Sequence, residues 1–286
     1  ADVARQVRRT RPQLIAGTPA LFDTLLREPA MRTADLSRLR VALCSTDTLP
    51  RAVKEGLETL VAGRGGNVRV VEGYRLTESV STVIATPDEY REGSIGVPLP
   101  GNYAKVVRTG TREEIDPGSE GEICISGPSV MQGYLDDPDA TAAALQVHAD
   151  GRTWFHTGDV GRMDYDGYFY FTCRLNRVIR AGGFNVYPPQ VEAVLASHPM
   201  VAEAYVVGVP DESQGERVKA YVVLKPGVAA SPDVSEQLIA HCRTQLIRGS
   251  CPSTIEFRDS LPRACSGEVD SRALDDSHTD PVPRVH

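Results

Sequence analysis

The sequence predicts an α/β fold followed by an α+β fold. Helical patterns alternate with short apolar runs up to about residue 110, which is typical of β-α-β layers. Turn residues then become dense between residues 93 and 127, which predicts a β-rich subdomain. A second, smaller set of helices and strands follows residue 176 and predicts a small α+β domain.

In the first part, residues 39–43 and 68–71 are predicted strands, and residues 51–62 form a predicted helix between them. This β-α-β order implies that the two strands pair in parallel. Residues 93–127 contain residues that end short strands and favour turns, namely Pro98, Pro100, Pro117 and Gly118.

The second part begins after a strand and a linker expected within residues 168–179. Pro188-Pro189 precedes a helix that includes Gln190, and Ser231-Pro232-Asp233 is the start signal of another helix. Residues 203–209 and 218–224 are predicted strands. The last residues, 275–286, are expected to be a disordered tail.

Composition excludes several classes of function. The 286 residues are 41% hydrophobic and 24% charged, as in a globular protein. A net charge of −7 and the lack of a Lys/Arg run argue against a nucleic-acid partner, and no apolar run is long enough for a transmembrane segment. The six cysteines have no disulfide or metal spacing, which indicates reduced thiols in a cytoplasmic protein.

The most informative segment runs from Trp154 to Asp159 and is followed by Arg174 and the pair Gly182-Gly183. Strand-like residues lead into Thr157-Gly158-Asp159, so we expect a tight turn to present Asp159 at the end of a strand. A carboxylate there can accept hydrogen bonds from both hydroxyls of a ribose, and the Arg174 guanidinium can donate to the same sugar or to a phosphate. A surface salt bridge is the alternative for Arg174.

Four further segments occur in a fixed order, namely Gly73–Glu78, Gly127–Tyr134, Asp211–Glu216 and Leu261–Glu268. Together with the Thr-Gly-Asp turn they resemble the adenylate-forming (AMP-binding) superfamily, in particular its acyl-CoA synthetases. The resemblance implies a partial AMP-binding large domain over residues 1–175 and the C-terminal domain of such enzymes over residues 176–274. It also implies ATP/AMP, Mg²⁺ and CoA as cofactors or co-substrates, and a carboxylic acid as substrate.

The resemblance also implies roles for single residues. Thr77 would contact the α-phosphate, Glu78 would bind the metal, and Tyr74 would lie against the adenine ring. Asn176 would be the hinge between the two half-reactions, and the Gly182-Gly183 turn would lie near the acyl-thiol tunnel. An ordinary turn remains the alternative for Thr77 and Glu78, and a core position remains the alternative for Tyr74. We interpret His156 as a packed structural residue.

The chain departs from the family pattern at several positions. Glu268 stands where relatives have the lysine that bridges the carboxylate substrate and the α-phosphate, Arg75 replaces a glycine, and Ser45-Thr46 replace a glycine pair. The upstream phosphate-binding loop of the family is not in the sequence, so we expect the C-terminal part of such an enzyme, with a missing N-terminal half as its partner. These departures predict an inactive ligase. The alternatives are a non-catalytic adenylate-binding or interaction module, and an adenylation domain that loads a carrier protein.

Overall fold

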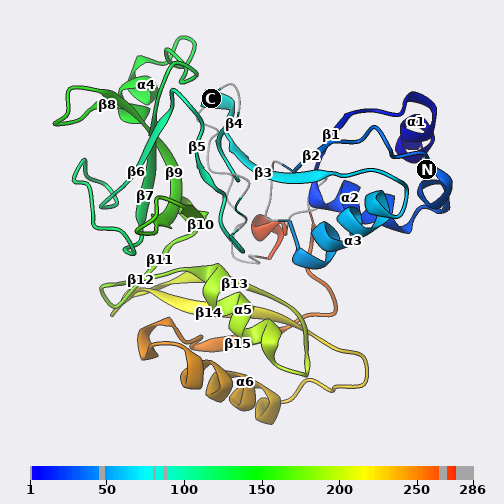
Figure 1. Ribbon diagram of the computed structural model, residues 1–286. Coiled ribbons are helices and arrows are strands. Elements are labelled where there is room, and N and C mark those ends of the chain that lie inside the picture. Colours follow the sequence, from blue (N-terminus) through cyan, green and yellow to red (C-terminus); the bar gives the residue numbers. More distant parts are fainter. Residues whose placement is uncertain are drawn as a thin grey trace. The chain divides into compact units, whose positions relative to one another are not determined.

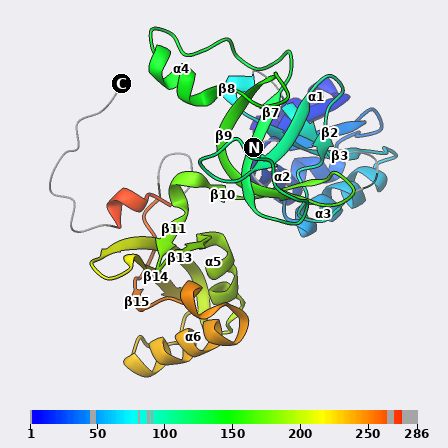
Figure 2. The ribbon, with the colours of Figure 1, turned by 90° about the vertical axis from the view of Figure 1, so that its left-hand side faces the viewer.

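A computed structural model describes residues 2–44, 49–79, 82–86, 89, 91–263 and 269–274 (Figure 1; Figure 2). The chain divides into two compact units, Ala1–Phe171 and Thr172–His286. The domain assignments made from the sequence, with a boundary between residues 175 and 176, stay predictions. The predicted tail, residues 275–286, lies outside the described residues.

The first unit contains a mixed sheet whose neighbouring strands follow chain order. The strands are β1 (Leu14–Gly17), β2 (Val41–Cys44), β3 (Arg69–Arg75), β4 (Thr82–Ala85) and β5 (Val97–Pro98). β1, β2 and β3 are parallel, whereas β4 is antiparallel to both β3 and β5. The parallel pairing predicted from the β-α-β order is confirmed.

Three α-helices and a 3₁₀ helix accompany this sheet, namely α1 (Asp2–Thr10), α2 (Pro19–Arg27), α3 (Arg51–Ala62) and η1 (Pro29–Thr33). The bounds of α3 are those predicted from the sequence. Thr18 caps α2 by accepting a hydrogen bond from the backbone N–H of Leu21 at 3.2 Å, and Pro19 occupies the first turn. Figure 1 shows α2 and α3 side by side along β1–β3, where Phe22, Leu25, Leu57 and Val61 are buried in one apolar core.

The second sheet of this unit is antiparallel in its described pairings and has the order β10-β9-β7-β6, with β8 beside β9. Its elements are β6 (Tyr103–Val107), β7 (Gly121–Ser126), α4 (Pro138–Ala144), β8 (Leu145–Val147), β9 (Thr153–Met163) and β10 (Phe169–Arg174). A core of Val83, Ile84, Val106, Ile123, Ile125 and Phe169 joins the two sheets. The β-rich subdomain expected from the turn residues is present.

The second unit is the expected small α+β fold, with strand order β12-β11-β14-β13 and β15 parallel to β14. Its elements are η3 (Leu175–Arg177), β11 (Ile179–Ala181), β12 (Phe184–Val186), α5 (Pro188–Ser197), β13 (Val201–Asp211), β14 (Gly215–Leu224), α6 (Pro232–Gln245), η4 (Arg248–Ser250), β15 (Thr254–Phe257) and η5 (Ser271–Ala273). Ser231 caps α6 by accepting from the backbone N–H of Val234 at 3.2 Å, which confirms the predicted start signal. Val191 and Leu195 of α5 and Leu238 of α6 are buried in a common core with the sheet.

Five of the cysteines lie in the described part of the chain, and none of these five is in a disulfide. Cys44, Cys124, Cys173 and Cys242 are buried, and Cys251 is partly buried. Within the described residues, none of the helices has both the length and the apolar character that crossing a bilayer requires.

Candidate functional site

The Thr157-Gly158-Asp159 turn is a bulge inside β9. Glu122 of β7 pairs with Val160, and Cys124 pairs with His156, so three residues of β9 stand opposite Ile123 alone. The expectation that Asp159 lies at the end of a strand is therefore wrong: β9 continues to Met163. A bulge bends one strand and re-aims a side chain without ending the sheet, which explains how Asp159 leaves the regular ladder.

Side chains satisfy the backbone groups that the bulge removes from the ladder. The Thr157 hydroxyl donates to the Ile123 carbonyl at 2.7 Å and accepts from the backbone N–H of Asp159 at 3.1 Å. The backbone N–H of Gly158 donates to Glu122 Oε1 at 3.0 Å. Gly158 has a φ of +68°, a left-handed conformation that favours glycine. The local structure of the bulge thus explains why the motif has threonine at position 157 and glycine at position 158.

Asp159 is held from the first sheet as well. Its side chain is 1% exposed, and Oδ2 accepts a hydrogen bond of 2.6 Å from the hydroxyl of Tyr74 in β3. The structure therefore brings together two residues that the sequence singled out separately. The Tyr74 ring packs against the core that contains Val83 and Phe169. Its predicted contact with adenine stays a prediction.

Thr77 and Glu78 lie in the 3₁₀ turn η2 (Thr77–Ser79), directly after β3. Glu78 Oε1 accepts from the Tyr134 hydroxyl at 3.0 Å, and the Glu78 carbonyl accepts from the backbone N–H of Met131 at 2.7 Å. Burial, together with the hydrogen bond to Glu78, raises the pKa of Tyr134, so this hydroxyl keeps its proton and donates. Two sequence motifs thus meet at Glu78, and the role of Tyr134 there was not found from the sequence.

The oxygen ligands available at η2 suit a hard cation. Glu78 is half-buried with one carboxylate oxygen oriented by Tyr134, and the neighbouring Thr77 is exposed. Mg²⁺ binds through one or two carboxylates, water and phosphate oxygens, so a single carboxylate beside a hydroxyl fits this ion. Arg75, which replaces a family glycine, is exposed at the end of β3. Ser45-Thr46 and Glu268 lie outside the described residues.

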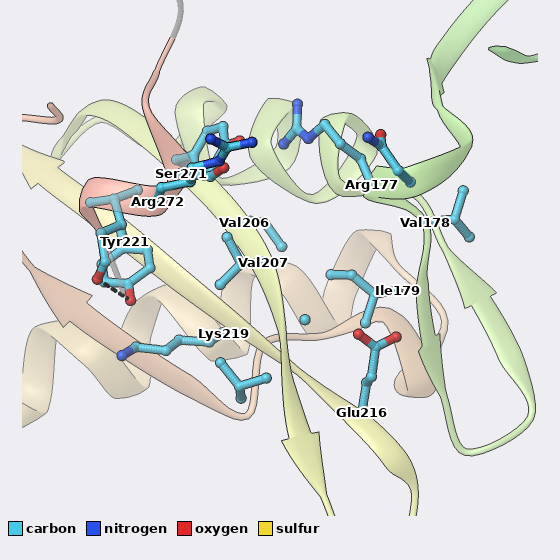
Figure 3. A pocket seen from close by; sticks show the side chains of 15 residues that line it. Arg177, Val178, Ile179, Val206, Val207, Glu216, Lys219, Tyr221, Ser271 and Arg272 are labelled. Carbon is cyan, nitrogen blue, oxygen red and sulfur yellow. Dashed lines mark hydrogen bonds between the residues drawn. The ribbon is translucent and has the colours of Figure 1, made fainter. Parts of the chain in front are cut away.

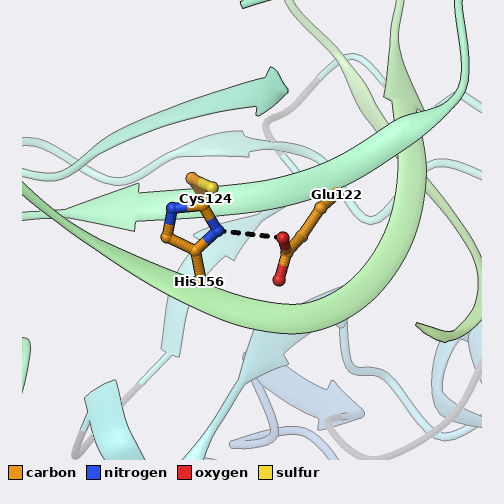
Figure 4. A group of neighbouring side chains, drawn as sticks. All are labelled: Glu122, Cys124 and His156. Atoms are coloured by element: carbon orange, nitrogen blue, oxygen red, sulfur yellow. Dashed lines mark hydrogen bonds and ion pairs between the residues drawn. The ribbon is translucent and has the colours of Figure 1, made fainter. Parts of the chain in front are cut away.

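Glu122 and Cys124, which are buried, and the partly buried His156 form a group beside the bulge, with potential ligand atoms within 4.8 Å of one another (Figure 4). His156 Nδ1 lies 2.9 Å from Glu122 Oε2, and His156 Nε2 lies 3.0 Å from His148 Nε2. Both ring nitrogens of His156 are therefore engaged. Burial raises the pKa of the Cys124 thiol far above its usual range, which favours the protonated thiol. We interpret the group as an interior hydrogen-bond network that supports the bulge.

His148 gives this network a pH-dependent contribution to stability. Burial lowers the pKa of His148 below its ordinary value of 6.5; Lys105, His156 and Arg112 add to the shift and Asp150 opposes it. As the pH falls through about 6.5, His148 becomes protonated in the unfolded chain while it stays neutral in the folded chain. The free energy of unfolding therefore decreases as the pH falls. We expect His148→Gln to reduce the loss of stability between about pH 7.5 and about pH 5.5, measured by urea unfolding. Equal losses in the variant and the wild type would contradict this assignment.

The remaining predicted site residues belong to the second unit. Arg174 ends β10 and Asn176 lies in η3. Since Asp159 belongs to the first unit, the pairing of Arg174 with Asp159 around a ribose stays a prediction. Ala181 pairs with Phe184, so Gly182 and Gly183 form a two-residue hairpin loop, with φ angles of +57° and +83°. Positive φ at both loop positions is the type I′ geometry that favours glycine, and the expected tight turn is confirmed.

A cavity of about 310 Å³ lies in the second unit (Figure 3). It is bordered by the predicted hinge residue Asn176, by residues of β13 and β14, and by Ser271, Arg272 and Leu274, which follow Glu268 in the sequence. Two of its cations are paired: Arg177 with Glu192 at 2.6 Å, and Lys219 with Glu256 at 2.7 Å. Asn176, the predicted hinge residue, and the segment after Glu268 thus border the same cavity.

Two family models match the chain. The model described as AMP-binding enzyme matches residues 1–135, and the model described as AMP-binding enzyme C-terminal domain matches residues 190–268. A long-chain-fatty-acid–CoA ligase of Bacillus subtilis (strain 168) is 38% identical over 281 residues, covering 98% of this chain and 48% of the relative. A feruloyl-CoA synthase of an Amycolatopsis species is 38% identical over 272 residues, covering 93% of this chain and 52% of the relative.

Solved structures that are similar to this chain also include a CoA synthetase. The o-succinylbenzoate CoA synthetase of Bacillus subtilis, in complex with its acyl-adenylate intermediate, has a TM-score of 0.76 and 31% identity, covering 98% of this chain and 54% of that one. ATP-bound MatB from Rhodopseudomonas palustris has a TM-score of 0.75 and 29% identity, covering 96% and 52%. The chain spans about half the length of the curated relatives it matches.

Proposed function

We propose that this chain, which belongs to the family of AMP-binding enzymes, is part of a ligase of the acyl-CoA synthetase type. Such a ligase joins a carboxylic acid to AMP at the expense of ATP and then transfers the acyl group to the thiol of CoA. The acyl-CoA ligases among the relatives support the reaction class, and the nucleotide and acyl-adenylate complexes among the structural neighbours support nucleotide binding.

The observation that carries the proposal is the presentation of Asp159. A bulge takes Asp159 out of the regular ladder, and the Tyr74 hydroxyl holds one of its carboxylate oxygens. A carboxylate acts as an acceptor for the two hydroxyls of a ribose, which is the recognition that AMP and ATP require. We assign Asp159 to the ribose, with Arg174 as its partner and the Tyr74 ring against the adenine.

Thr77 and Glu78 would bind the phosphate groups of ATP, directly or through Mg²⁺. Glu78, oriented by the Tyr134 hydroxyl, would hold Mg²⁺, and Thr77 would donate to the α-phosphate. When bound, Mg²⁺ neutralises charge on the triphosphate during transfer. Asn176 would be the hinge of the second unit between the half-reactions, and the Gly182-Gly183 turn would border the path of the CoA thiol.

Glu268 leads us to propose that the chain forms little or no acyl-AMP by itself. A carboxylate in place of the family lysine adds a negative charge where a carboxylate substrate and an α-phosphate must both bind. A non-catalytic adenylate-binding module is therefore the second candidate function, favoured by Glu268 and Arg75. Under either function we propose the cytoplasm as the compartment, because none of the described cysteines is in a disulfide. The N-terminal half of a ligase is the protein partner we propose.

Binding of AMP tests the ribose assignment. We expect titration calorimetry to detect AMP binding to the wild-type chain and to lose it in Asp159→Ala, because the acceptor for the two hydroxyls is removed. Asp139→Ala is the matched control, since Asp139 is an exposed carboxylate in the first turn of α4. Undiminished affinity in a folded Asp159→Ala variant would remove Asp159 from the site.

A further inference from the structure

Glu122 lies beside the turn that carries Asp159 and makes two hydrogen-bonding contacts with β9. One carboxylate oxygen accepts from the backbone N–H of Gly158 at 3.0 Å, and the other lies 2.9 Å from His156 Nδ1. Glu122 is only 5% exposed. The Glu122 side chain therefore contacts both chain neighbours of Thr157, namely His156 and Gly158.

His156 links Glu122 to a second histidine, His148. Because a carboxylate only accepts, His156 donates its Nδ1 proton to Glu122. The other ring nitrogen of His156, Nε2, lies 3.0 Å from Nε2 of His148, and the tautomers of the two rings decide which of them donates. The bulge is thus linked to a chain of hydrogen bonds that joins Glu122, His156 and His148.

We propose that Glu122 is a positioning residue for Asp159: by fixing the Gly158 peptide, it sets the direction in which the Asp159 carboxylate meets a ribose. This inference rests on the proposed function and extends it to a residue that touches no nucleotide. The role depends on hydrogen-bond reach and not on charge, because a second carboxylate repels Asp159 and cannot attract it. Tyr74 constrains the Asp159 carboxylate directly, through the hydrogen bond from its hydroxyl.

Two substitutions separate reach from charge. Glu122→Gln keeps the length and the acceptor for Gly158, and its amide can donate to His156 once that ring moves its proton to Nε2. Glu122→Asp keeps the charge but is one methylene shorter, so it cannot span Gly158 and His156. By calorimetry we expect AMP affinity within about threefold of the wild type for Glu122→Gln and about tenfold weaker for Glu122→Asp. Glu113→Asp is the control, an exposed carboxylate paired with Arg108 at 2.9 Å.

Nuclear magnetic resonance supplies readouts that need no nucleotide. We expect slow amide exchange at Gly158 in the wild type and in Glu122→Gln, faster exchange in Glu122→Asp, and a change of the His156 tautomer in Glu122→Gln. A folded Glu122→Asp variant with wild-type affinity and wild-type Gly158 exchange would overturn the proposal. If Glu122→Asp does not fold, Glu122→Gln decides: loss of Gly158 protection or of AMP affinity there would overturn it. Absence of AMP binding to the wild type would instead contradict the proposed function. In that case, amide exchange at Gly158 in the Glu122 variants would still test whether Glu122 fixes the Gly158 peptide.

Discussion

Replacing Glu268 by lysine is expected to raise ATP–pyrophosphate exchange by about 10²–10³-fold in a chain extended with the N-terminal half of a homologous acyl-CoA ligase. One positioned transition-state donor has an effect of this size, and the substitution also removes a negative charge from a site that must bind two anions. The exchange of labelled pyrophosphate into ATP, with long-chain fatty acids and aromatic acids as substrates, measures the first half-reaction alone.

Glu268→Gln provides the control for this experiment. It removes the negative charge without adding a donor cation, so its exchange rate should fall between those of the glutamate and lysine forms. Equal, near-zero exchange in all three folded forms would contradict the assignment of Glu268 as the main defect. That outcome would favour the non-catalytic module and would direct attention to Arg75 and Ser45-Thr46.

Phe169→Ala is expected to destabilise the first unit by about 3–5 kcal/mol. Phe169 is 1% exposed and shares its core with Val83, Ile84 and Ile123, the residue opposite the Asp159 bulge. Removing the ring leaves a cavity that these neighbours cannot fill without moving the backbone of β4 or β7. Urea unfolding followed by tryptophan fluorescence would report the change, because Trp154 lies in β9 and is 5% exposed.

Phe171→Ala is the matched control for Phe169→Ala. Phe171 lies on the same strand but is 40% exposed, so its loss should cost much less. A larger loss of stability for Phe171→Ala than for Phe169→Ala would show that the core does not pass through β10 as described.

Short-range chemistry determined the elements that the sequence predicted well. Helix α3 follows from its apolar spacing, α6 starts where Ser231 and Pro232 signal a start, and the Gly182-Gly183 loop needs only two residues with positive φ. The ordered motifs, including Thr157-Gly158-Asp159, likewise identified the family without any structure. All of these signals lie within a few neighbouring residues, where periodicity, capping and turn preferences act.

Only the tertiary structure decided how Asp159 is held. Tyr74 and Asp159 are 85 residues apart in the chain, and Glu122 and Gly158 are 36 apart, yet each pair is joined by a hydrogen bond. The bulge exists because β7 and β9 pair with two different registers on either side of Ile123. Local preferences do not specify the register between distant strands, since it is set by which side chains pack together across the sheet. The sequence could therefore identify Asp159, whereas the roles of Glu122, His148 and Tyr134 became clear only from the fold, which places Glu122 beside Gly158, His148 beside His156 and Tyr134 beside Glu78.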